Sequence, residues 1–313
     1  MKLEKMNRIG IVVPTYNPGP MWNQWLEKMK SQSLMPEVRL IIDSTSNDGT
    51  MTYETHQLFE VQTISKSEFN HGGTRQLAVS KIAEQVDIVI FMTQDALLHD
   101  EHSLRNLVQV FSENSNVAAA YGRQLPHAGS RPSEAHARIF NYAEKSVLKS
   151  LASKKDLGFK SIFISNSFSA YRVKDLMDIG GFPTNVILGE DTMVAAKLLL
   201  SGKTVAYQAG AIVHHSHHYT YGEEFKRYFD IGVLHAREPW LLIEFGQVSG
   251  EGMRYLCSEM RHVMSDAWYL IPSTLIRTFF KYVGYKMGRY EKYFPTKLKK
   301  RMSMYKGYWL KNN

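Results

Sequence analysis

The chain has 313 residues, of which 44% are hydrophobic, so it can form one large α/β domain with an appendage or two modest domains. Its single cysteine, Cys257, excludes an internal disulfide framework and favours a reducing compartment. The polar residues 1–8 do not resemble a signal peptide, and no apolar run reaches the roughly 18 residues that a transmembrane helix needs.

The formal net charge of +8 is concentrated near the end of the chain. Residues 277–313 contain eleven Lys and Arg and one acid, Glu291, a net charge of +10, which leaves −2 for residues 1–276. This excess predicts an anionic partner, a membrane surface or nucleic acid. We rank nucleic acid lower, because the remainder of the chain is nearly neutral and carries no nucleic-acid recognition motif.

Short apolar runs alternate with helical patterns over the first two thirds of the chain. We predict strands at 9–13, 39–43, 61–64, 87–92, 117–121, 161–165, 204–207 and 211–215. We predict helices at 21–31, 76–85, 103–111, 134–151 and 190–200. This order indicates an α/β fold with a doubly wound, mostly parallel sheet, in which ligands bind at the carboxyl ends of the strands.

The turn after the first strand excludes a dinucleotide-binding dehydrogenase. It reads Pro14-Thr15-Tyr16-Asn17-Pro18-Gly19, whereas that fold requires G-x-G-x-x-G at this place. Gly72-Gly73 has two interpretations, a simple turn or a backbone cradle for a phosphate, with Arg75 supplying positive charge.

Asp95 and a run of histidines form a candidate metal site. Asp95 stands where the strand 87–92 ends, and a helix cap is the alternative role for it. Four of the twelve histidines lie at 214, 215, 217 and 218, where His215 and His217 share one face of an extended chain. Exposed decoration is the alternative for the histidines. Imidazole and carboxylate together suit a divalent cation such as Mg²⁺ or Mn²⁺.

Two adjacent acids, Glu190 and Asp191, open an apolar helix that ends near Ser201-Gly202. Acids at this place stabilise a helix through its dipole, which is the structural interpretation. The functional interpretation makes Asp191 a general base that the helix N-terminus keeps ionised. With a metal site and a glycine–arginine turn, the set suits transfer of a group from a phosphate-bearing donor to a hydroxyl.

The motifs resemble glycosyltransferase family 2, inverting enzymes with a GT-A fold. The resemblance rests on the order Val13-Pro14-Thr15-Tyr16-Asn17, Asp43 to Thr50, Gln94-Asp95-Ala96 and Gly189-Glu190-Asp191. The rhamnosyltransferase branch is resembled more narrowly, through residues 69–75, His215-Ser216-His217 and residues 227–233. The match covers about residues 8–240.

The resemblance implies transfer of L-rhamnose, with inversion, from dTDP-L-rhamnose to a cell-surface polysaccharide, often on a polyprenyl-diphosphate carrier. It assigns the catalytic residues, Asp191 as base with Glu190 placing a sugar. It assigns the nucleotide-sugar contacts, Pro14, Tyr16, Asp43, Ser44, Arg75, Gln94 and Asp95. It assigns the metal ligands, Asp95 with His215 or His217.

Two positions depart from the family pattern. Gln94-Asp95 supplies one carboxylate where many members have two, which predicts weaker metal binding. Ser44 replaces a second aspartate after Asp43, so recognition of the base would depend on Asp43 or on backbone groups.

We divide the chain into a catalytic domain, residues 1–240, and a basic, aromatic helical extension, residues 241–313. For the extension we weigh an interfacial helix on anionic lipid, a helical hairpin packed on the catalytic domain, and a contact between subunits of a homo-oligomer. We expect a cytoplasmic protein at the inner face of the cell membrane. The alternatives in function are another nucleotide sugar and a catalytically silent nucleotide-sugar-binding assembly protein.

Overall fold

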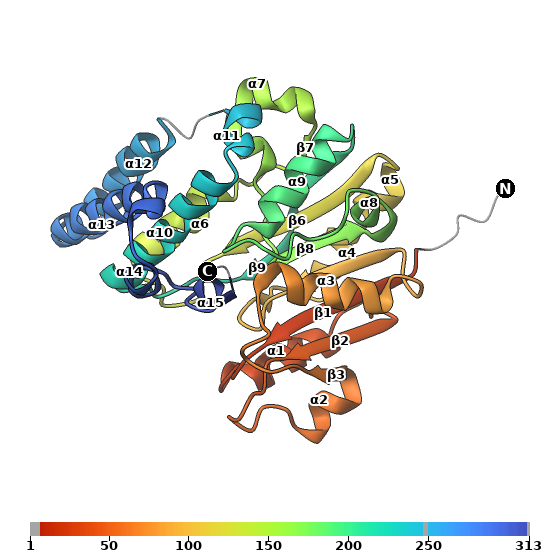
Figure 1. Cartoon of the computed structure of the whole chain (residues 1–313). Coiled ribbons are helices and arrows are strands. Elements are labelled where there is room, and N and C mark those ends of the chain that lie inside the picture. The colour runs from red at the N-terminus through yellow and green to blue at the C-terminus, as the bar shows by residue number, and fades with distance from the viewer. Residues whose placement is uncertain (1–6, 247–249, 312–313) are drawn as a thin grey trace.

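The computed structural model describes residues 7–246 and 250–311. Figure 1 shows a twisted central sheet with flanking helices and a helical C-terminal region on one side. Over these residues the sheet has nine strands in the order β3-β2-β1-β4-β8-β6-β9-β5, and β7 pairs with β9. The strands are β1 Ile9–Thr15, β2 Val38–Asp43, β3 Glu60–Thr63, β4 Ile88–Met92, β5 Leu97–Leu98, β6 Val117–Leu125, β7 Val147–Lys149, β8 Phe168–Arg172 and β9 Thr204–His214.

Fifteen α-helices surround the sheet in the described ranges. They are α1 Met21–Lys30, α2 Tyr53–Leu58, α3 His71–Ile82, α4 Ser103–Val108, α5 Val110–Glu113, α6 Pro132–Asn141, α7 Lys154–Leu157, α8 Val173–Asp178, α9 Glu190–Leu200, α10 Tyr221–Arg237, α11 Trp240–Phe245, α12 Glu251–Asp266, α13 Ile271–Arg289, α14 Thr296–Met302 and α15 Tyr308–Lys311.

Strand β1 shows why the sheet is covered on both faces. Ile11 and Val13 pack into one hydrophobic core with Trp22 and Trp25 of α1, whereas Val12 packs into a second core with residues of α3 and α9. Successive side chains of a strand point to opposite faces, so a continuous apolar run fills two cores at once. The α/β fold that the apolar runs predict is confirmed.

The sheet is parallel across β3, β2, β1 and β4. Strand β8 is antiparallel to both β4 and β6, and β6 is parallel to β9. The two reversals cancel, so β1, β2, β4, β6 and β9 all end at the same edge of the sheet. Their carboxyl-terminal loops therefore converge there.

Two predicted elements are wrong. The helix expected at 134–151 ends at Asn141, and the short strand β7 follows it. The strand expected at 161–165 is instead a 3₁₀ helix, Gly158–Ile162, and the strand lies at β8. Short apolar runs do not distinguish strand from helix by periodicity, and β8 is specified by its partners β4 and β6 rather than by its own pattern.

The two strands expected at 204–207 and 211–215 form one strand, β9. Its register against β6 shifts between Gly122 and Arg123, where Gln208 and Ile212 are the successive partners. A Cβ on Gly122 would lie 2.3 Å from Phe168, so this position requires glycine. Strand β9 ends at His214, and His215 begins the following loop.

Helices α10 and α13 pack backbone against backbone. A Cβ on Gly288 would lie 2.0 Å from the carbonyl oxygen of Phe229, and one on Gly232 would lie 2.3 Å from that of Tyr285. These contacts fasten one face of α13 to α10. The C-terminal residues Met302 and Trp309 then join the same core as α3 and α9. The extension thus packs on the catalytic body, and the boundary at residue 240 stays a prediction.

Part of the basic charge of the extension is neutralised internally. Arg277 and Lys281 pair with Glu224 of α10, and Lys299 pairs with Glu291. In the described parts of the chain, no helix combines the length and apolar character needed to span a bilayer.

Candidate active site

The loops after β1, β2 and β4 are joined at the sheet edge by hydrogen bonds. The amide of Gln94 accepts from the backbone nitrogen of Tyr16 at 2.7 Å and donates to its carbonyl oxygen at 3.0 Å. The backbone nitrogen of Asn17 donates to Ser46 Oγ at 2.8 Å. Gln94, predicted to contact the donor, therefore also holds the β1 loop in place.

Asp43 is buried and its carboxylate is occupied by the loop around it. Oδ1 accepts from Thr15 Oγ1 at 2.8 Å and from Ser46 Oγ at 2.6 Å, and Oδ2 accepts from the backbone nitrogen of Ser46 at 2.8 Å. Ser44 is buried beside it, and its hydroxyl has no hydrogen-bond partner in the described structure. Asp43 shapes the loop, and its direct contact with a base stays a prediction.

Tyr16 presents a partly exposed ring at the end of β1, one residue beyond the strand that contains Pro14. The ammonium of Lys66 donates to Tyr16 Oη at 2.6 Å and lies 4.1 Å from the ring centroid. The pair offers an aromatic face and a positive charge to a bound nucleotide. No sequence motif indicated a role for Lys66.

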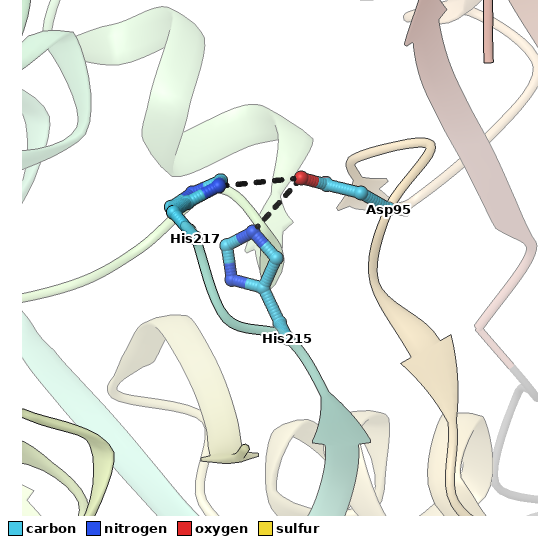
Figure 2. Close-up of side chains that lie close together, drawn as sticks. All are labelled: Asp95, His215 and His217. Atoms are coloured by element: carbon cyan, nitrogen blue, oxygen red, sulfur yellow. Dashed lines mark ion pairs between the residues drawn. The ribbon is translucent and has the colours of Figure 1, made fainter. Parts of the chain in front are cut away.

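Asp95, His215 and His217 converge, as the strand-end argument predicts. Figure 2 shows both imidazoles turned toward the carboxylate of Asp95, from the loop after β9 and the loop after β4. His215 Nε2 lies 3.3 Å and His217 Nδ1 lies 3.6 Å from Asp95 Oδ2. Within the described residues, these three form a group able to hold a metal ion.

The tautomer of His215 follows from its neighbours. Gln124 Oε1 accepts from Arg138 at 2.8 Å and lies 2.9 Å from His215 Nδ1. Because a guanidinium only donates, this Gln124 atom is an oxygen, and His215 Nδ1 carries a proton. In the neutral ring, His215 Nε2 then faces Asp95 with its lone pair, buried and 3.3 Å from Asp95 Oδ2. Burial lowers the pKa of His215, and it lowers that of His217 to about 3, which keeps both rings neutral.

Two lone pairs that face each other need a cation between them. Metal–ligand bonds of about 2.1 Å at about 90–110° place two ligand atoms about 3.0–3.4 Å apart, close to the 3.3 Å and 3.6 Å observed. The hydrogen bond from Nδ1 to Gln124 is the contact that a metal-binding imidazole typically makes. The residues fit a divalent cation.

Glu190 and Asp191 open α9 at the same edge, but their environments differ. Glu190 is buried, and its Oε1 lies 3.0 Å from Arg75 Nη1 and 3.1 Å from Asn166 Nδ2. Asp191 is partly exposed and accepts from two backbone nitrogens, those of Thr192 at 2.7 Å and Asn166 at 3.2 Å.

These contacts separate the pKa values of the two acids. Burial acts to raise the pKa of Glu190, but the charge of Arg75 outweighs it and the pKa is lowered. For Asp191, burial and then the charge of Glu190 raise the pKa to about 6. Two neighbouring carboxyl groups with separated pKa values are typical of an acid–base site. With a pKa of about 6, Asp191 is ionised at neutral pH and can accept a proton, and its role as general base stays a prediction.

Arg75 and Gly72 help to position the two acids, Glu190 and Asp191. Arg75 is 4% exposed and also donates to the carbonyl oxygen of His71 at 3.0 Å. A Cβ on Gly72 would lie 1.8 Å from the carbonyl oxygen of Pro183, so Gly72 lets α3 approach the loop before α9. The amide of Gly73 is bonded to the Asn70 side chain at 2.6 Å, which leaves the proposed phosphate cradle without that donor.

Sequence reasoning missed several residues of the site. Asn166 binds both acids, and its side-chain oxygen is fixed by Ser169 and Tyr171 at 2.8 Å and 2.7 Å. Arg227, on the first turns of α10, lies over the ring of Tyr219 at 5.8 Å, and Asp191 contributes to its raised pKa. Asn166 lies in the loop before β8, which starts at this edge because it is antiparallel to β4 and β6. Arg227 opens the 227–233 stretch that carries the family resemblance, and that stretch was the available signal for it.

Comparison with known proteins identifies the family of this chain. A family model described as glycosyltransferase like family 2 matches residues 7–230. The chain is a family 2 glycosyltransferase. It is 45% identical over 303 residues to the O-antigen chain rhamnosyltransferase RfbN of Salmonella typhimurium strain LT2, covering 96% of each chain. It is 44% identical over 300 residues to the O-antigen chain rhamnosyltransferase WbaN of Salmonella anatum, covering 96% of this chain and 95% of the relative.

Solved structures confirm the GT-A fold of this glycosyltransferase. The mannosyltransferase PcManGT from Pyrobaculum calidifontis, in complex with GDP-Man and Mn²⁺, superposes with a TM-score of 0.60 at 16% identity, covering 92% of this chain and 89% of that one. TarS of S. aureus, residues 1–349, superposes with a TM-score of 0.53 at 14% identity, covering 92% and 93%. The fold class and the family expected from the sequence are confirmed.

Proposed function

We propose that this glycosyltransferase moves L-rhamnose from dTDP-L-rhamnose to a hydroxyl group of a growing cell-surface polysaccharide carried on a polyprenyl diphosphate. The main observation behind the proposal concerns Asp191. Its carboxyl group has a pKa raised to about 6 and lies at the same sheet edge as Asp95, His215 and His217. The two O-antigen chain rhamnosyltransferases, at 45% and 44% identity, support the sugar and the class of acceptor.

The proposed reaction is a single displacement with inversion at the anomeric carbon. The Asp191 carboxylate accepts the proton of the acceptor hydroxyl as its oxygen forms a bond to the anomeric carbon. The bond from that carbon to the nucleotide breaks, and its electron pair leaves with the diphosphate. Glu190, held ionised by Arg75, keeps Asp191 basic and places a sugar hydroxyl.

The donor side of the site contains groups that would neutralise the negative charge of the diphosphate. A divalent cation held by Asp95, His215 and His217 would neutralise charge on the departing diphosphate. Arg227 supplies a guanidinium close to this group. Its charge acts to lower the pKa of His217, and the charge of Asp191 acts to raise the pKa of Arg227. A guanidinium matches phosphate oxygens in geometry as well as charge. Tyr16, with Pro14, Asp43, Ser44 and Gln94, forms the nucleoside side.

A screen of nucleotide sugars tests the donor. We expect dTDP-L-rhamnose with Mn²⁺ to give transfer to a lipid-linked or synthetic acceptor, and dTDP to raise the thermal unfolding temperature more than GDP or UDP. GDP-mannose and UDP-glucose serve as controls. Faster transfer from either control sugar would replace the rhamnose assignment and leave the glycosyltransferase assignment intact.

We propose further that α13 rests on an anionic membrane surface at the cytoplasmic face. Leu275, Phe279 and Tyr282 are exposed at helical spacing on the face opposite the α10 contact, and Phe279 is 63% exposed. Trp268 is 73% exposed just before the helix. Aromatic side chains beside exposed lysines such as Lys286 suit the interface of an anionic bilayer.

Vesicle sedimentation tests this surface. Phe279→Ser with Tyr282→Ser should weaken binding to phosphatidylglycerol-containing vesicles by about tenfold or more, because each ring contributes on the order of 1 kcal/mol of interfacial burial. Tyr53→Ser, a tyrosine 79% exposed on α2, is the matched control and should leave binding unchanged. Equal binding of the double variant and the wild type would exclude α13 as the lipid contact.

A further inference from the structure

The C-terminal segment 303–309 reaches the active site from the far end of the chain. Asp230 of α10 is fully buried, and its Oδ2 accepts from the backbone nitrogens of Met304 at 2.9 Å and Tyr305 at 3.3 Å. Trp309, 1% exposed, fixes the other end of the segment in the core. In Figure 1, α15 lies near α3, whereas α14 lies beside α10.

Between these two anchors, Tyr305 packs on His71, the first residue of α3. The two ring centroids are 4.5 Å apart with the planes at 85°, and the ring of Phe69 also contacts that of His71, at 5.3 Å. Edge-to-face contacts at these distances fix the orientation of a ring. The orientation of His71 therefore depends on a residue more than 200 positions away in the sequence.

His71 belongs to the surroundings of the acid pair. Its carbonyl oxygen accepts from Arg75, which pairs with Glu190, and the next residue, Gly72, touches the loop before α9. Burial lowers the pKa of its imidazole to about 4, while the charge of Glu190 acts to raise it. Its Nε2 is buried and has no hydrogen-bond partner within the described residues, so the ring is held by packing rather than by polar contacts.

Tyr305 also lies within electrostatic range of Arg227, the guanidinium proposed for the donor side. Burial raises the pKa of its phenol to about 12, Arg227 lowers it, and Tyr219 and Glu190 raise it. These influences identify Arg227, Tyr219 and Glu190 as neighbours of the ring. Tyr305 is thus within electrostatic range of both Glu190 and Arg227.

We propose that segment 303–309 is a component of the active centre, in which Asp230 fastens the segment and Tyr305 is a positioning residue for His71 and the Arg75–Glu190 pair beside Asp191. The inference rests on the proposed transfer reaction, since it is the placement of Asp191 against the acceptor hydroxyl that Tyr305 secures. Loss of the ring would let His71 turn and the start of α3 shift against α9. A displacement on the order of 1 Å at a reacting group lowers the rate about 100-fold.

The test separates positioning from folding and from nucleotide binding. Tyr305→Ala should lower kcat by about 30–100-fold, with dTDP binding, measured by calorimetry, within about threefold of the wild type. Tyr305→Phe keeps the ring and should retain kcat within about threefold. Asp230→Ala should reproduce the loss of kcat, because two backbone amides lose their acceptor and the segment is released.

Phe294→Ala is the matched control, since Phe294 belongs to the same C-terminal extension and packs on the same core but lies outside segment 303–309. It should leave kcat within about threefold. A Tyr305→Ala enzyme with wild-type kcat overturns the inference, and so does an equal loss of kcat in Tyr305→Ala and Phe294→Ala, which would indicate a general packing role. Activity of the wild type is measured first with each nucleotide sugar, so failure of the donor assignment is seen separately.

Discussion

Asp191→Asn is expected to lower kcat by about 10²–10⁴-fold, the range that a general base contributes. The amide keeps the shape of the side chain, and its single oxygen can accept from one of the two backbone nitrogens, that of Thr192 or that of Asn166, but it cannot take the proton of the acceptor hydroxyl. Binding of dTDP should survive, because the proposed reaction places Asp191 at the acceptor hydroxyl and not at the nucleotide. The measurement is transfer under saturating donor, with calorimetry of dTDP binding alongside.

The matched control is Asp178→Asn, an exposed acid at the end of α8 whose partner is Lys174. It should leave kcat unchanged. An Asp191→Asn enzyme that keeps more than about a tenth of the wild-type kcat would remove Asp191 from its proposed role and return it to helix capping.

The pH profile gives a second readout of the same carboxylate. Its folded-state pKa is raised to about 6, so the basic form predominates only above that pH. We expect kcat/KM to fall about tenfold per pH unit as the pH drops below 6, and to lose this limb in Asp191→Asn. The same shift destabilises the fold slightly above the unfolded pKa, because the unfolded chain ionises this group more easily. An acid limb centred near pH 4 would contradict the environment described for Asp191.

The features recovered from sequence are those that local pattern and strand order determine. The carboxyl ends of β4 and β9 meet because of the direction of the two strands, and the alternation of side chains brings His215 and His217 to Asp95. The adjacent acids at the start of α9 were visible as a motif. The motif assigns roles to the two acids only by their position in the sequence. The contact between Glu190 and Arg75 was needed to distinguish the environment of Glu190 from that of Asp191.

The features missed depend on contacts between distant parts of the chain. Strand β8 is defined by its neighbours β4 and β6, so its own sequence did not identify it. Asn166 and Tyr305 reach the site through a loop and a tail that carry no periodic pattern. The pKa of Asp191 depends on burial, which a helix-start motif does not reveal.

Removal of the proposed metal is the second large effect. Chelation by EDTA should reduce transfer by at least about 100-fold, since a bound cation supplies several kcal/mol of charge stabilisation, and Mn²⁺ should restore it. Asp95→Asn should weaken Mn²⁺ binding, followed by electron paramagnetic resonance, by at least about tenfold. His218→Gln, in the same histidine run but paired with Glu134 at 2.8 Å, is the control and should bind Mn²⁺ as the wild type does.

A proton could also join Asp95 to His215, and Gln124 distinguishes this ion pair from a metal site. Gln124 accepts the Nδ1 hydrogen of His215, which directs the Nε2 lone pair at Asp95. In a metal site, Gln124→Met should lower the Mn²⁺ affinity by about 10–100-fold, the usual cost of losing such a partner, even though Gln124 is not a ligand. In a carboxylate–imidazolium pair, EDTA would leave transfer intact and Gln124→Met would not alter the Mn²⁺ signal. Those two results together would refute the metal site, because a proton on His215 Nε2 would then balance the charge of Asp95.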